Sequence, residues 1–179
     1  MYEIIREFGF SAAQVDEVIK LLSSESGRYV QSATHRIIKN RRWFIIAQTQ
    51  TEQVQTLIID ADEDRILFEN SALALEQIKS KNVQVVNDPA IALIDQSTLQ
   101  FPLLLRKWKR GDYFYPLGLK KKKKLARFFI DQKLSMTDKE KVWVLESNKK
   151  ILWVVGLRID DRFKITGSTK QVLRVQFTN

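Results

Sequence analysis

The sequence contains no cysteine, only three prolines and six glycines, and a single histidine, His35. Without cysteine the chain forms no disulfide, no thiol nucleophile and no cysteine-ligated zinc site, and such a composition fits a cytoplasmic protein. A metal site needs three or four converging ligands, and a histidine base needs a nucleophile to activate. We therefore interpret His35 as structural and expect no metal site and no catalytic residue in this chain.

Long hydrophobic runs are missing as well. No apolar stretch approaches the roughly 18 residues that span a bilayer, and the first ten residues lack the basic start and apolar core of a signal peptide. No glycine-rich phosphate-binding loop is present. With 179 residues, 44% of them apolar and 28% charged, the chain is long enough for one or two globular domains with a sizeable core. These features predict a soluble, cytoplasmic protein.

The basic charge is concentrated in the C-terminal part of the chain. Residues 1–100 carry 10 Lys and Arg against 14 Asp and Glu, a net charge of −4, whereas residues 101–179 carry 20 against 7, a net charge of +13. Together these give the +9 of the whole chain. An asymmetry of this kind indicates that one part of a protein meets a polyanion, either nucleic acid or an anionic membrane.

The N-terminal residues carry helix-terminating and helix-initiating signals. Residues 2–7 are predicted to end a helix, closed by Gly9, and Ser11 with Gln14 forms a capping-box pattern before an amphipathic helix at Ala12–Leu22. Two helices joined by a short turn could form a DNA-reading motif, but the second helix opens with acids, which argues against phosphate contacts. Because the chain begins within a helix, we expect the natural protein to continue upstream.

Most of the remaining segments are predicted as short strands. Residues 28–39 and 43–48 should form a hairpin, and 73–78 fits either a short helix or an irregular strand. The other predicted strands are 57–60, 66–68, 83–86, 91–94, 101–108, 142–146, 151–155 and 171–177. A helix of about ten residues should end near Lys133.

The predicted fold class is α+β, with an N-terminal helical hairpin and short β-hairpins followed by a small mixed α+β C-terminal domain. The predicted boundary, where the charge balance changes sign, gives a linking region at 1–98 and a basic domain at 99–179.

The segment Arg106–Lys133 combines five consecutive lysines with a Gly-Asp turn and several aromatic residues. We interpret it as a folded basic face that binds a polyanion, with Trp108, Phe128 and Phe129 in the core. Any single lysine can be a solvated charge, whereas repulsion within the cluster favours a partner. The alternative partner is an anionic membrane surface, although the apolar residues of the segment are needed for the core. The candidate contact residues are Arg106, Lys107, Lys109, Arg110, Lys120, Lys121, Lys122, Lys123, Lys124 and Arg127, with Lys133 as a weaker candidate.

A second charged cluster, Asp160–Asp161 between Arg158 and Arg162, has two interpretations. Paired carboxylates serve in acid–base catalysis, but adjacent residues of a strand point to opposite faces. Four charges of mixed sign are better explained by ion pairing, and we favour that structural role.

Several motifs occur in a fixed order within residues 99–178. They are Trp108, Gly111–Asp112, Pro116 with Gly118, Lys123–Lys124, Phe129–Ile130–Asp131 with Lys133, and Trp153 to Gly156. In this order they resemble the C-terminal domain of bacterial tRNA(Ile)-lysidine synthetase, and residues 9–22 and 27–47 are similar to the linking region of that family. The chain departs from the family at Tyr113, where arginine is usual, at Lys121, where glycine is frequent, and at Arg127, where an acid is more common.

The resemblance implies a role in tRNA modification. The family joins lysine to the wobble cytidine of a minor isoleucine tRNA with ATP, which changes decoding from AUG to AUA. That chemistry belongs to an N-terminal domain with a Ser-Gly-Gly-x-Asp-Ser loop, a motif that this chain lacks. The resemblance therefore implies an inactive tRNA-gripping part of a ligase, with lysine, ATP and Mg bound by the missing domain and no cofactor here. It leaves oligomerisation open.

Overall fold

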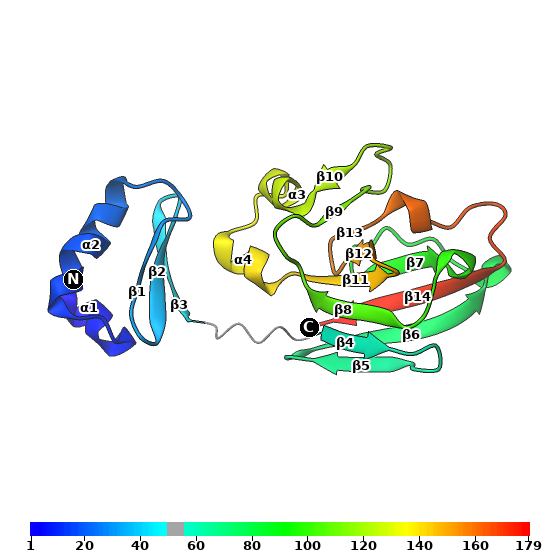
Figure 1. The fold of residues 1–179 in the computed structure, drawn as a ribbon, viewed down its shortest axis with the longest axis horizontal. Helices are drawn as coiled ribbons and strands as arrows, with labels where there is room; N and C mark the ends of the chain where they lie inside the picture. Colours follow the sequence, from blue (N-terminus) through cyan, green and yellow to red (C-terminus); the bar gives the residue numbers. More distant parts are fainter. Residues whose placement is uncertain (50–55) are drawn as a thin grey trace. The chain divides into compact units, whose positions relative to one another are not determined.

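The computed structural model describes residues 1–49 and 56–179, which fall into two compact units. The first unit contains 1–49 and Lys133–Glu140, and the second contains 56–132 and Lys141–Asn179. Short helices accompany several antiparallel sheets (Figure 1), so the predicted α+β class is confirmed.

Two helical segments open the first unit. Helix α1 (Tyr2–Ile5) continues as a 3-10 turn that ends at Gly9, whose φ of 77° lies in the left-handed region. The predicted capping box is present, since the Ser11 amide donates to Gln14 Oε1 at 3.1 Å, and α2 (Val15–Lys20) follows. With 3-10 turns at Ala12–Gln14 and Leu21–Ser23 on either side of α2, the chain is helical over the predicted segment Ala12–Leu22.

A three-stranded sheet completes the first unit, in the order β1 (Tyr29–Gln31), β2 (His35–Asn40) and β3 (Trp43–Gln48). The single strand predicted at 28–39 is divided, because the Ser32 hydroxyl bonds the Phe8 carbonyl at 2.7 Å and accepts from the His35 amide. The His35 ring lies edge-on to Phe8, as a structural role requires. One face of the sheet packs on the helices through the buried residues Ile5, Phe10, Val18, Leu21, Val30 and Ile37.

The second unit is built from two larger antiparallel sheets. The five-stranded sheet has the order β13 (Arg158–Ile159), β12 (Lys150–Val154), β11 (Trp143–Ser147), β8 (Leu103–Lys107), β4 (Thr56–Ile59). The four-stranded sheet has the order β5 (Arg65–Phe68), β6 (Ser71–Lys79), β14 (Gln171–Thr178), β7 (Ile91–Asp95). Side chains of both sheets form one core that includes Leu105, Trp153 and Val175.

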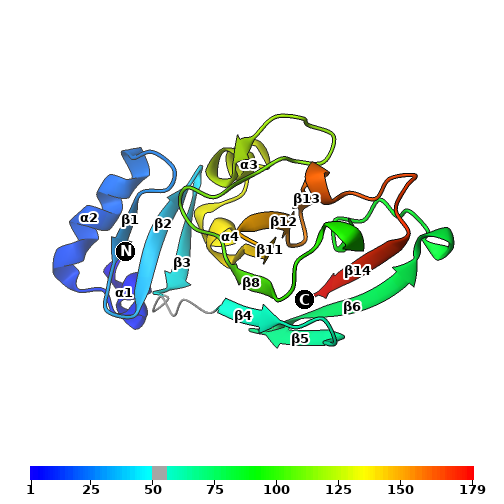
Figure 2. The ribbon, with the colours of Figure 1, turned by 45° about the vertical axis from the view of Figure 1, so that its right-hand side comes forward.

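The division of the structure differs from the boundary predicted near residue 98. Strand β4 pairs with β8 (Figures 1 and 2), and β14 lies between β6 and β7 (Figure 1), so strands from both sides of residue 98 share the same sheets. The units divide on either side of residues 50–55 instead. The change of charge sign failed to mark a boundary because the acidic turn 60–64 joins strands of the same unit as the lysines.

Two further differences concern secondary structure. The ambiguous segment 73–78 is part of the long strand β6. The strand predicted at 83–86 is absent, and Val85 and Val86 are exposed without a partner strand in the described residues. The helix predicted to end near Lys133 is α3 (Leu125–Asp131), and α4 (Met136–Lys141) follows it.

Candidate nucleic-acid interface

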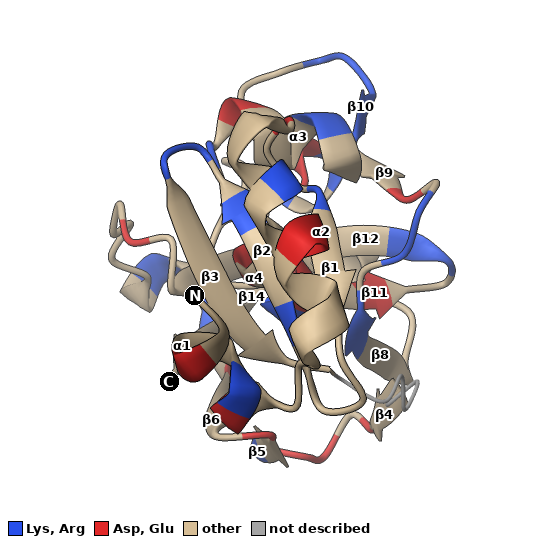
Figure 3. Cartoon of the chain, turned by 90° about the vertical axis from the view of Figure 1, so that its left-hand side faces the viewer, with Lys and Arg blue, Asp and Glu red and all other residues tan. Residues whose placement is uncertain are grey.

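The lysine run lies in a two-stranded hairpin of the second unit. Strand β9 (Tyr113–Phe114) pairs with β10 (Lys123–Lys124), and residues 115–122 connect them. We call residues 113–124 the basic hairpin. Figure 3 shows basic residues in blue on this hairpin; all of them are lysines, and Lys120, Lys121 and Lys122 are exposed.

Two adjacent acids hold the base of this loop. Asp160 is fully buried and accepts from the Tyr115 amide at 2.9 Å while it pairs with Arg162 at 2.7 Å. Asp161 accepts from the Gly118 amide at 3.1 Å and pairs with Lys164 at 3.0 Å. The Asp160–Asp161 cluster therefore serves ion pairing, as predicted, and it fixes the backbone that carries the lysines.

These contacts also shift the pKa values of Asp161 and Arg162. The hydrogen bond from Lys164, with that from the Gly118 amide, lowers the pKa of Asp161 below its usual value. Asp160 raises the pKa of Arg162 by hydrogen bonding, against the opposing effect of burial. Both shifts favour the charged form of the side chain, and the base of the loop is held by two ion pairs.

Helix α3 packs against the basic hairpin through aromatic side chains. Leu125, Phe128 and Phe129 are buried on its inner face. Phe128 meets Phe114 edge-on at 5.0 Å between ring centroids, and Phe129 meets Trp108 in the same way at 5.0 Å. The predicted core role of Phe128 and Phe129 is confirmed, whereas Trp108 is half-buried and packs on Phe129 at the edge of this cluster.

Three of the predicted contact residues are engaged within the fold. Arg106 on β8 has a side chain only 13% exposed, and it pairs with Asp112 at 2.8 Å and Glu146 at 2.6 Å. Burial opposes its charge, but both carboxylates outweigh that effect and raise the pKa of Arg106. Lys107 pairs with Glu69 at 2.9 Å and lies over the Trp143 ring.

The third engaged residue is Lys123, which pairs with Asp131 at 2.7 Å. Arg127 shares this carboxylate at 3.3 Å, but its side chain is 71% exposed. The hydrogen bond from Lys123 lowers the pKa of Asp131. Lys123 is thus held beside the helix, whereas most of Arg127 remains accessible to a ligand.

The other predicted residues of the basic face are exposed. Lys122 lies 3.6 Å from the centroid of the Tyr113 ring, a cation–π contact that the sequence pattern did not single out. Of the candidate contact residues, those with no ion pair within 4.0 Å to another described residue are Lys109, Arg110, Lys120, Lys121, Lys122, Lys124 and Lys133. Lys133 follows α3 and belongs to the first unit, so it is not placed relative to the basic hairpin.

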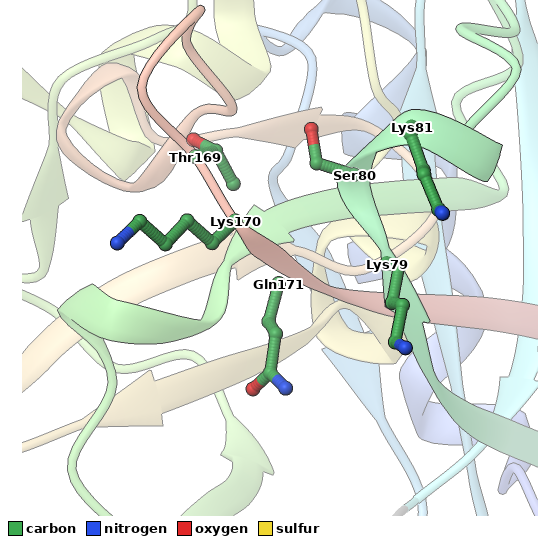
Figure 4. Close-up of a pocket in the computed structure, with 6 residues that line it drawn as sticks. All are labelled: Lys79, Ser80, Lys81, Thr169, Lys170 and Gln171. Atoms are coloured by element: carbon green, nitrogen blue, oxygen red, sulfur yellow. The ribbon is translucent and has the colours of Figure 1, made fainter.

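A shallow hollow elsewhere in the second unit is lined partly by lysines that sequence reasoning did not list. Lys79 and Lys81 flank the end of β6, and Lys170 precedes β14. Figure 4 shows the Lys170 side chain pointing to the opposite side from Lys79 and Lys81, so the three ammonium groups do not converge on one anion. Within the described residues, no group of three His, Cys, Asp or Glu could hold a metal ion, and no helix is long and apolar enough to cross a membrane.

Comparisons with known proteins agree with the resemblance seen in the sequence. Residues 1–50 match the family model of the TilS substrate binding domain, and residues 103–176 match that of the TilS substrate C-terminal domain. The chain is 38% identical over 178 residues to the tRNA(Ile)-lysidine synthase of Parabacteroides distasonis, covering 99% of this chain and 40% of that protein. For the Bacteroides thetaiotaomicron protein of the same name the identity is 28% over 173 residues, covering 97% and 38%.

The chain thus spans about 40% of the length of these relatives. A solved structure described as the crystal structure of TILS C-terminal domain aligns with a TM-score of 0.54 at 20% identity, covering 68% of this chain and 89% of that one. This likeness shows a common fold. From the two matched family models and the named relatives, the chain belongs to the tRNA(Ile)-lysidine synthase family and corresponds to its substrate-binding and C-terminal domains.

Proposed function

We propose that this chain is the tRNA-binding part of a tRNA(Ile)-lysidine synthase and that its basic hairpin binds phosphates of the tRNA body or acceptor stem. The observation that carries the proposal is a loop of exposed lysines whose backbone is fixed by the acids Asp160 and Asp161. Like charges held this close repel one another, and a polyanion removes that cost. Lysine suits the role because it binds phosphate as a mobile point charge.

The geometry of an RNA duplex favours contacts between these lysines and phosphates over contacts with bases. The major groove of an RNA duplex is too narrow for side chains, so stems are recognised by shape, phosphates and 2′-hydroxyls. A projecting hairpin of lysines matches this requirement. We assign Arg106, Lys107 and Lys123 to the fold because carboxylates occupy them. The proposed contact residues are Lys109, Arg110, Lys120, Lys121, Lys122, Lys124 and Arg127.

In the whole enzyme we expect lysine to be joined to the wobble cytidine of a minor isoleucine tRNA with ATP. We place ATP, magnesium and lysine in a part of the enzyme outside this chain, and we expect the 179-residue chain alone to bind tRNA without modifying it. The enzyme would act in the cytoplasm, where its tRNA substrate is found.

The proposal predicts a defined response to salt. Binding of a tRNA transcript should weaken as salt rises, with the logarithm of the affinity linear in the logarithm of salt concentration, because counterions are released from phosphates. In the double variant Lys120→Glu, Lys121→Glu, the magnitude of that slope should fall by about two. Filter binding or fluorescence anisotropy across a salt series measures it.

The matched control is Lys149→Glu, Lys150→Glu, which changes the net charge equally at the exposed β11–β12 turn. This control should lose long-range attraction but keep the slope within about half a unit of wild type. An equal loss of slope in both variants would show that only net charge matters and would remove the basic hairpin from the interface.

One observation favours the alternative of an anionic membrane surface. Leu117 and Leu119, on the same loop as the lysines, are 36% and 50% exposed, and apolar residues beside lysines can insert at a lipid surface. Flotation with phosphatidylserine vesicles, with and without competing tRNA, separates the two functions. Flotation that persists in excess tRNA and depends on Leu119 would support the membrane.

A further inference from the structure

One tryptophan of the first unit is placed unlike the other three. Trp43, at the start of β3, is 75% exposed, whereas Trp143 and Trp153 are 4% and 0% exposed and Trp108 packs on Phe129. A tryptophan this open forgoes most of the stabilisation that burial of its indole would provide. Its position therefore indicates a contact that the isolated chain does not make.

The surroundings of Trp43 are rich in arginine. Arg41 and Arg42 form the β2–β3 turn immediately before it, and both are exposed. The turn has a fixed form, because the Arg41 amide donates to Ser26 Oγ at 2.7 Å. Exposed Arg28 lies beside the same end of the sheet, since the Lys39 amide donates to its carbonyl at 2.8 Å. No ion pair to an acid is found for these three arginines within the described residues.

The strand register places a second aromatic residue on the same face as Trp43. Ile38 lies opposite both Tyr29 on β1 and Ile45 on β3. Because alternate residues of a strand share a face, Ile45 and Trp43 point the same way, and Tyr29 joins them. Tyr29 is 48% exposed. This face is the opposite of the one whose Ile37 packs on the helices.

We propose that the β2–β3 turn is a second RNA contact, at which Trp43 stacks on an unpaired base while Arg41 and Arg42 bind the flanking phosphates. The inference rests on the proposed function for tRNA as the partner. It adds a contact of different chemistry in the other unit, since the basic hairpin offers mobile charges whereas this turn offers an exposed aromatic ring next to two arginines.

Charge and geometry favour RNA as the partner at this turn. An indole face stacks on any base, and stacking of this kind tolerates any sequence. Arginine forks onto phosphate, is weakly hydrated, and itself stacks on exposed bases. Unpaired nucleotides in loops and bends are where proteins reach RNA bases. The absence of a nearby acid partner for the arginines, within the described residues, leaves them available to an anionic ligand.

The test separates stacking from charge. Trp43→Ala should weaken binding of a tRNA transcript about tenfold, as loss of one stacked base does, and should leave the salt slope unchanged. Trp43→Phe should recover most of the affinity because it keeps an aromatic face. Arg41→Ala with Arg42→Ala should lower the slope by about two. Ile4→Ala, which removes another exposed apolar side chain, 63% exposed on α1, should bind as wild type does.

Two further measurements use RNA form and fluorescence. A blunt RNA duplex with the same number of phosphates should bind wild type and Trp43→Ala equally, because it has no unpaired base. In the wild type, acrylamide should quench the emission of Trp43, and the tRNA transcript should protect it; this quenchable emission should be missing from Trp43→Phe.

The outcomes are distinct. Wild-type affinity in Trp43→Ala, or a Trp43 that stays quenchable in saturating tRNA, overturns the inference and leaves the basic hairpin untouched. An equal loss of affinity for duplex and transcript also overturns it, since the contribution is then not stacking on an unpaired base. Failure of the wild-type chain to bind tRNA at all overturns both this inference and the proposed function.

Discussion

Arg106 illustrates how a residue with the right charge and the right position in sequence can be unavailable to a ligand. Its guanidinium lies between Asp112, six residues away in sequence, and Glu146, forty residues away. The nearer acid belongs to the Gly-Asp turn of the motif, but nothing in the sequence places Glu146 beside Arg106 until β8 and β11 pair. Lys107 repeats the pattern with Glu69. The sequence identified a basic segment, and only tertiary pairing decides which of its charges are free.

Replacement of Arg106 should therefore affect stability. In Arg106→Leu the carboxylates of Asp112 and Glu146 remain nearly buried without their cation, and the free energy of unfolding should fall by about 3 kcal/mol. Urea denaturation followed by tryptophan fluorescence measures this change. Arg127→Leu, whose side chain is 71% exposed, should cost no more than about 0.5 kcal/mol. Similar losses in the two variants would contradict the buried role of Arg106.

Asp161 gives a prediction with a pH dependence. Its pKa is lowered in the folded protein, so its contribution to stability is present above the unfolded pKa of about 4 and is lost as pH falls through the folded pKa. Asp161→Asn should therefore be less stable than wild type near neutral pH, and the difference should disappear once the pH has fallen below the folded pKa. Urea midpoints over a pH series measure it, and a difference that persists in strong acid would assign the effect to packing.

At the scale of elements, local sequence patterns predicted the helix caps and the hairpin, but they could not predict which distant strands pair. The capping box at Ser11–Gln14 and the hairpin before Gln48 depend on residues a few positions apart, and both are present. The strand assignment of 73–78 and the absence of a strand at 83–86 depend on distant partners. Strand β6 exists because β14 pairs along its length, whereas Val85 has no such neighbour among the described residues. Periodicity alone carries no information on such partners.

Gly9 connects a local signal to a tertiary contact. It ends the first helical segment at a φ of 77°, and a Cβ there would lie 2.9 Å from Thr34 Oγ1. Gly9→Ala should lower the free energy of unfolding by more than about 1 kcal/mol, from strain and from this close approach together. Gly27→Ala is the matched control, because its φ is 96° but no atom lies within 4 Å. Thermal unfolding followed by circular dichroism compares them, and equal losses would attribute everything to backbone strain.

At the scale of the whole molecule, the order of the strands within the sheets differs from their order in the sequence. Strand β14, the last of the sequence, lies inside the four-stranded sheet and contributes Val172, Leu173 and Val175 to the buried interior. The second unit is therefore completed only by its final segment. A boundary read from charge alone could not detect this, because the acidic turn 60–64 between β4 and β5 and the basic hairpin belong to one compact unit.

Deletion of residues 171–179 should consequently abolish the cooperative unfolding of the second unit. Strands β6 and β7 would both lose a partner, and the core would be open along its length. Near-ultraviolet circular dichroism of the buried tryptophans should lose its signal, while the helical first unit keeps its own far-ultraviolet signal. A truncated chain with a sharp second-unit transition would show that β14 is dispensable.

The acids beneath the basic hairpin have a kinetic consequence. A loop already held by Asp160 and Asp161 need not order itself when a ligand arrives, so the encounter itself would limit association. Electrostatic steering then speeds capture at low ionic strength, and added salt should slow the association rate more than it raises the dissociation rate. A fixed cationic loop thus favours rapid association with many RNAs. Discrimination among them would then depend on their dissociation rates.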